Sequence, residues 1–182
     1  LINLDLSGGS AGAAATITGD GFRAISCKFE SQNDNYIALK FLPTAVAGST
    51  ASLAVVDSCE FAWCTIGIDF NSVTSTCTQS LIKNCWFHNY SAAGLKDTLA
   101  PGVRNLMVTG CTFDAMEDGT LPTKFISLAT ATNTGLISGC TFHDTSATLA
   151  NSTGMVAVPA AMSIAVTGCY GGVSLAVIQS AA

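Results

Sequence analysis

The sequence predicts an all-β solenoid of about six coils, built on an internal repeat. Six times along the chain an apolar residue is followed three positions later by a cysteine, with Ser, Asn or Gly directly before that cysteine. In the first five copies a phenylalanine comes two residues after the cysteine, and in the sixth copy Gly171 takes that place. The repeat cysteines are Cys27, Cys59, Cys85, Cys111, Cys140 and Cys169, and the repeat phenylalanines are Phe29, Phe61, Phe87, Phe113 and Phe142.

The distance between repeat cysteines varies, while the motif around each cysteine stays constant. Successive intervals are 32, 26, 26, 29 and 29 residues, as expected for a solenoid whose loops differ in length. Because cysteine and phenylalanine are two residues apart, both side chains lie on one face of a strand, and we assign that face to the core. Each set should therefore form a buried column, with its members spaced by the ~4.8 Å between paired strands.

Further strands are predicted on both sides of each motif. Strands that follow the motif are expected at residues 36–41, 66–70, 92–95, 124–128, 155–158 and 173–178. Short strands that lead into the motif are expected at residues such as 53–56 and 106–108. The residue before each cysteine is of a type that tolerates left-handed backbone, so the chain should bend there. This gives three short strands per coil, and we interpret the Ala-rich patch at residues 11–15 as a loop.

Stacked N-C-x-F and G-C-x-F segments of this kind resemble those of the right-handed parallel β-helix in the pectate-lyase-like superfamily. Within that superfamily, the chain most resembles the β-helical segments of phage tailspikes and other virion structural proteins. The resemblance covers nearly the whole chain. It implies a right-handed parallel β-helix with coils of 26–32 residues, which we treat as a single domain over residues 1–182 and as a fragment or processed part of a longer chain. It also implies a homotrimer that contacts other virion proteins.

Composition excludes several classes of protein. The mean hydropathy is +0.47, but no run approaches the ~18 apolar residues that span a bilayer, so no membrane span is predicted. The net charge is −5 and the seven Lys and Arg residues are scattered, which argues against nucleic-acid binding. No C-x-x-C pair exists, so we expect no metal and no cofactor. Cys64 and Cys77 lie outside the repeat. They could form a disulfide with each other, but we favour two free thiols.

Polar residues three positions after the repeat cysteines are the candidates for catalysis. His88, Asp114 and His143 fall on successive coils, with Asp144 beside them, and a carboxylate between two imidazoles is capable of acid and base chemistry. Solvated loop residues would produce the same alignment, and the motifs of polygalacturonases are absent, so we favour a protein that is not an enzyme.

The outward positions after the cysteines offer a second kind of site. Trp86 and Tyr170 are candidates for stacking on sugar rings, and Lys28 and Glu60 should meet as an ion pair on adjacent coils. The leading hypothesis is a virion structural protein, as a capsid decoration or a tailspike or fibre segment, serving reinforcement or host attachment. One alternative is a polysaccharide lyase or glycoside hydrolase domain. Another is a segment of a bacterial surface adhesin, which would be secreted or held at the cell surface.

Overall fold

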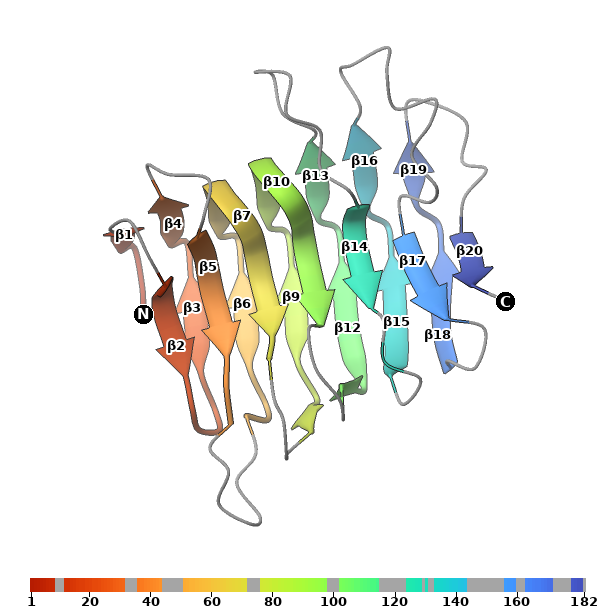
Figure 1. Ribbon diagram of the computed structural model, residues 1–182, viewed down its shortest axis with the longest axis horizontal. Coiled ribbons are helices and arrows are strands. Elements are labelled where there is room, and N and C mark those ends of the chain that lie inside the picture. Colours follow the sequence, from red (N-terminus) through yellow and green to blue (C-terminus); the bar gives the residue numbers. More distant parts are fainter. Residues whose placement is uncertain are drawn as a thin grey trace.

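The computed structural model is a parallel β-solenoid, so the fold class predicted from the sequence is confirmed (Figure 1). The structure describes residues 1–8, 12–31, 36–43, 51–71, 76–97, 102–114, 124–128, 130, 133–143, 156–159, 163–171 and 178–181. These residues contain strands and turns but no helix. None of them forms a helix long and apolar enough to cross a membrane.

The strands build three walls around the core, and the chain passes through one strand of each wall per coil, as predicted. Wall I is the six-stranded sheet at the back of Figure 1. Its strands are β3 (Arg23–Ile25), β6 (Val55–Asp57), β9 (Leu81–Lys83), β12 (Leu106–Thr109), β15 (Thr134–Ser138) and β18 (Ser163–Thr167). Two short strands, β8 (Cys77–Thr78) and β11 (Val103–Arg104), pair on their own beside it.

Walls II and III belong to one twelve-stranded sheet that bends between them. Wall II contains β1 (Asp5–Gly8), β4 (Lys28–Ser31), β13 (Thr112–Asp114), β16 (Thr141–His143) and β19 (Tyr170–Gly171). Wall III contains β2 (Gly12–Ile17), β5 (Tyr36–Phe41), β14 (Lys124–Leu128), β17 (Val156–Pro159) and β20 (Ile178–Ala181). The long strands β7 (Glu60–Phe70) and β10 (Trp86–Asp97) run through both walls.

The bend from wall I into wall II occurs at the residue before each repeat cysteine. This residue has a positive φ in every copy, between 52° and 62°. The six residues are Ser26, Ser58, Asn84, Gly110, Gly139 and Gly168. Left-handed backbone is available to Gly at no steric cost and to Asn and Ser at a small one, so the choice of these residue types explains where each coil turns.

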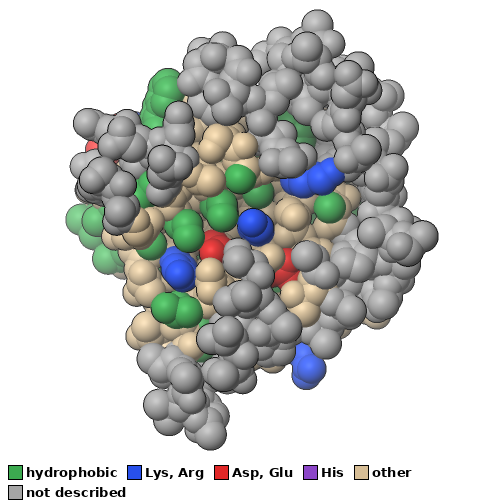
Figure 2. Space-filling view, viewed as in Figure 1, with side chains coloured by type: hydrophobic (Ala, Val, Ile, Leu, Met, Phe, Trp, Pro, Cys, Tyr) green, Lys and Arg blue, Asp and Glu red, His purple; other side chains and the backbone are tan. Residues whose placement is uncertain are grey.

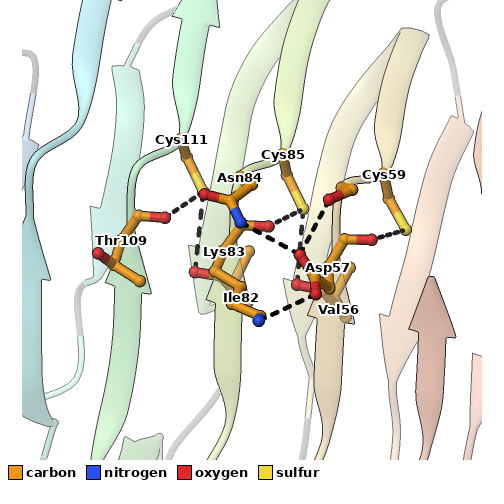
Figure 3. A network of polar contacts seen from close by, with 10 residues as sticks. Val56, Asp57, Cys59, Ile82, Lys83, Asn84, Cys85, Thr109 and Cys111 are labelled. Atoms are coloured by element: carbon orange, nitrogen blue, oxygen red, sulfur yellow. Dashed lines mark hydrogen bonds and ion pairs between the residues drawn. The ribbon is translucent and has the colours of Figure 1, made fainter. Parts of the chain in front are cut away.

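Inside the solenoid the repeat cysteines and phenylalanines lie in register. The cysteines from Cys27 to Cys140 are at most 2% exposed, and Cys169 near the last coil is partly buried. Figure 3 shows how the thiols are satisfied: Cys59 donates to the carbonyl of Asp57 at 3.3 Å and Cys85 to that of Lys83 at 3.2 Å. None of the eight cysteines is in a disulfide, so Cys64 and Cys77 are not paired with each other.

The phenylalanine rings stack in nearly parallel planes along the solenoid. Centroids are 5.0, 4.8, 4.6 and 5.3 Å apart from Phe29 through to Phe142, with neighbouring planes within 18° of parallel. A shorter second stack joins Phe41 to Phe70 in wall III at 5.2 Å. Offset stacking of this kind adds ~0.5–1.5 kcal/mol per pair to the burial of the rings.

Two parts of the sequence analysis need correction near the N-terminal end. Residues 12–15 of the Ala-rich patch, which we interpreted as a loop, belong to strand β2, which pairs in register with β5. In addition, a degenerate copy of the motif precedes Cys27: Asn3 has a φ of 52°, and Leu4 and Leu6 take the places of cysteine and phenylalanine. The copy escaped notice because both of its diagnostic residues are replaced.

Candidate functional site

The outer face of wall II carries two in-register columns of side chains. The first column consists of Lys28, Glu60, Trp86, Thr112, Thr141 and Tyr170. The second consists of Glu30, Ala62 and His88 on β4, β7 and β10, and of Asp114 and His143 on β13 and β16. Because the inner face of these strands is filled by cysteine and phenylalanine, every second residue is directed outward. Wall II therefore carries those of the predicted site residues that the structure describes.

At the β4 end of the wall, charged groups pair across adjacent strands. The ammonium of Lys28 bonds Glu30 on its own strand and lies 3.6 Å from Oε1 of Glu60 on β7. The hydrogen bond with Glu30 raises the pKa of Lys28, and the negative charge of Glu60 adds to that effect. The ion pair between Lys28 and Glu60 that we predicted is thus present, and Lys28 stays charged over the physiological range.

In the middle of the wall an aromatic pair is held by two carboxylates. The rings of Trp86 and His88 stack with centroids 4.0 Å apart and planes at 21°. Nε1 of Trp86 donates to Oδ2 of Asp114, and Nε2 of His88 lies 3.1 Å from Oε1 of Glu60. The indole is therefore fixed in orientation although 45% of Trp86 is exposed.

Asp114 links this aromatic pair to the next coils. Its Oδ1 atom lies 2.9 Å from Nδ1 of His143 on β16. We expected Asp114 to lie between the two imidazoles of His88 and His143. Its two oxygens instead bond Trp86 and His143, because the long indole reaches across one strand and His88 turns toward Glu60.

The other two predicted site residues stand apart from this network. Tyr170 follows Thr141 in the first column, on β19, and is 70% exposed. Asp144 lies outside the described residues. The role of Glu60 as partner of both Lys28 and His88 was only half predicted. A diagonal neighbour on the same face of a sheet is within reach of long side chains, and that rule applied to Glu60 and His88 would have found the second contact.

The donor set of wall II does not form a metal site. No group of three or more His, Cys, Asp or Glu side chains in the described part of the chain is arranged to hold a metal ion. What the wall offers is a row of hydrogen-bonding groups and two exposed aromatic rings along the solenoid axis. Comparison with known proteins found no matching family model, no matching curated protein and no matching solved structure.

Proposed function

We propose that the protein is a structural β-solenoid of a virion, as a capsid decoration or tailspike segment, and that wall II attaches it to a polysaccharide. The observation that carries the attachment role is the continuous series of contacts from Lys28 through Glu60, His88 and Trp86 to Asp114 and His143. A rigid, flat row of polar groups with exposed aromatic rings suits an extended chain of sugars. The virion setting rests on the resemblance of the repeat to tailspike β-helices.

The placement of the two aromatic rings limits how a sugar chain can lie. One face of the Trp86 indole is covered by His88, so a sugar ring can stack only on the opposite face. Tyr170 lies three strand steps further along the same column, which is ~14 Å at the usual strand spacing. A sugar chain that runs along the solenoid axis would touch both rings, whereas a single sugar would touch only one.

The charge of wall II indicates which class of polysaccharide it can bind. Asp5, Glu30, Glu60 and Asp114 contribute four carboxylates on the strands of wall II, against the single ammonium of Lys28. Like charges at close range cost free energy. We therefore infer that the ligand is a polymer of neutral or amino sugars, whose hydroxyl or ammonium groups donate to these carboxylates, and not a polymer of uronic acids.

A glycoside hydrolase is the second candidate, because Glu60 and Asp114 place two carboxylates on the same face of the wall. Glu60 on β7 and Asp114 on β13 are separated by two strand steps, or ~9.6 Å between the strands. Inverting glycosidases hold their two carboxyl groups ~6.5–9.5 Å apart. Asp114→Asn separates the two candidates, since an amide oxygen still accepts the hydrogen bond of Trp86 but an amide cannot act in acid or base catalysis.

Tryptophan fluorescence provides the test. The chain has two tryptophans, so Trp63→Phe leaves Trp86 as the sole reporter on wall II and keeps an aromatic ring at position 63 for any ligand contact there. This protein is titrated with hexasaccharides of a neutral glucan, of glucosamine and of galacturonic acid. We expect the first two to change the emission and the third to bind at least tenfold more weakly.

Variants on two walls identify the binding surface. Trp86→Ala, measured by calorimetry, should weaken binding about tenfold, the usual cost of removing an aromatic anchor. The matched control is Met107→Ala on wall I, where a side chain of similar exposure should make no difference. Binding of none of the three sugars would refute the attachment role, whereas preference for the galacturonate would refute only the sugar class. Release of reducing ends that Asp114→Asn abolishes would favour the hydrolase.

A further inference from the structure

We propose that Trp63 is a further sugar-binding residue, which contacts a side branch of the polysaccharide whose main chain lies along wall II. The inference rests on the attachment role proposed above. Trp63 lies on β7 after Ala62, which pairs within wall II, and before Ile66, which pairs within wall III. It therefore stands at the corner between the two walls, and 43% of it is exposed. The indole is beside wall II and accessible to a ligand.

The exposed large apolar side chains of the described residues differ in kind from one part of the surface to another. The aromatic ones are Trp63, Trp86 and Tyr170, and all three lie on wall II or at its border. The aliphatic ones lie on or beside wall I and near the N-terminal end, and they are Leu53, Met107, Leu1, Ile2 and Leu4. Aromatic rings offer a flat apolar surface for the C–H face of a sugar ring. Trp63 therefore belongs with the two sugar-stacking candidates and not with a general apolar patch.

The indole of Trp63 has a binding group that the protein does not use itself. In Trp86, by contrast, Nε1 donates to Asp114 and one face of the ring is covered by His88. Within the described part of the chain, Trp63 makes no hydrogen bond and no ring contact. Tryptophan N–H groups normally find a hydrogen-bond partner when they become buried. The N–H of Trp63 can therefore donate to a hydroxyl of a sugar that covers the exposed part of the ring.

The position of Trp63 relative to the main sugar chain indicates a branch. Trp86 and Tyr170 share the first column of wall II, along which the main chain is proposed to lie. Glu60 occupies this column on β7, and Trp63 follows three residues later, at most ~10 Å along the strand. A linear chain that follows the column therefore passes to one side of Trp63. A sugar attached to that chain as a side branch can reach the indole.

The surface changes in character beyond this corner, on the outer face of wall III. An outward column on that wall consists of Thr16, Lys40, Asp69, Lys96 and Ser127, and Figure 2 shows charged side chains on that face. None of these five residues provides a ring on which a sugar could stack. We therefore expect a short branch that ends at Trp63 and does not continue onto wall III.

Calorimetry with two matched probes tests the branch contact. The probes are a linear glucan hexasaccharide and the same hexasaccharide with a single glucose branch in mid-chain. We expect the branched probe to bind at least ~fivefold more tightly to the wild-type protein, because Trp63 adds an aromatic contact. Trp63→Asn should remove this difference and leave the affinity for the linear probe unchanged, whereas Trp63→Tyr keeps a ring and should retain most of it. Asn89 has the same φ of 52° at the equivalent corner of β10, so the Asn variant should fold.

Leu53→Ala is the matched control, because Leu53 is also bulky, exposed and in left-handed conformation, with a φ of 58°, but lies beside wall I. This variant should bind both probes as the wild type does. Equal affinity of the wild type for the two probes, or a preference that Trp63→Asn leaves intact, would overturn the branch contact but not the attachment role. Weaker binding of the linear probe by Trp63→Asn would also overturn it, since the main chain itself would then cross Trp63. Binding of neither probe would refute the attachment role, and the branch contact with it.

Discussion

Gly94→Ala is the sharpest test of how the phenylalanine stack is packed. A Cβ atom at Gly94 on β10 would lie 2.7 Å from Cδ1 and 2.9 Å from Cε1 of Phe113, and 3.2 Å from the carbonyl oxygen of Phe125. Phe113 cannot move aside, because its ring is stacked between Phe87 at 4.6 Å and Phe142 at 5.3 Å. Overpacking of this kind costs ~1–3 kcal/mol, or a fall in Tm of ~2–12 °C for a chain of this size.

Urea unfolding followed by circular dichroism measures this cost. The matched control is Gly19→Ala, where an added Cβ meets no atom within 4 Å, so stability should change little. Phe113→Leu makes room for the methyl group, so the double variant Gly94→Ala/Phe113→Leu should lose less than the two single changes together. A cost below ~0.5 kcal/mol for Gly94→Ala, or strict additivity in the double variant, would refute the packing argument.

One labelling experiment and two substitutions test the core and the surface. A thiol reagent should label Cys169, the partly exposed member of its column, in the native protein. The buried cysteines should react only after unfolding. Equal labelling rates for all thiols in the native protein would contradict the structure. The hydrogen bond from Lys83 lowers the pKa of Asp57, so the pair stabilises the fold above the unfolded-state pKa and this contribution is lost as the pH falls through the folded-state pKa. Asp57→Asn should therefore cost up to ~1 kcal/mol at neutral pH and nothing in acid, and a cost that persists in acid would speak against the ion pair. Asn133, fully buried, donates to Asp97 at 2.6 Å and accepts from the N–H of Val103 at 2.7 Å. Asn133→Ala should therefore cost ~1–3 kcal/mol, because the buried N–H of Val103 loses its acceptor and Asp97 loses one of its donors, as a shift in the urea midpoint would show.

Strands with a clear local pattern could be predicted from the sequence, whereas those that depend on a distant partner could not. The predicted strands at 36–41 and 124–128 agree with β5 and β14 to the residue, because apolar side chains mark which positions face the core. β2 was missed because alanine has a low β propensity. Its strand conformation comes from pairing with β5, which lies more than twenty residues away and leaves no local signal.

At the candidate site, the position of each side chain on the wall could be predicted, but not its contacts. Counting one residue on from a core phenylalanine or from a repeat cysteine is enough to place Trp86, His88 and Asp114 on the outer face. Which partner each takes depends on the rotamer. The indole is long enough to reach the next strand, so Trp86 bonds Asp114 and His88 turns to Glu60.

Trp63, at the border of wall II, and Leu53, beside wall I, are the two bulky apolar residues in the described part of the chain that have a positive φ. Trp63 and Asn89 occupy equivalent corners on β7 and β10, each with a φ of 52°. Asn tolerates this left-handed conformation, whereas for a bulky residue it costs ~1–2 kcal/mol of conformational free energy. Burial does not compensate, since 43% of Trp63 is exposed. Strain that a protein keeps without a gain in packing is typical of functional positions. The exposed indole of Trp63, three residues beyond Glu60, therefore supports the proposal that this side of the solenoid contacts a ligand.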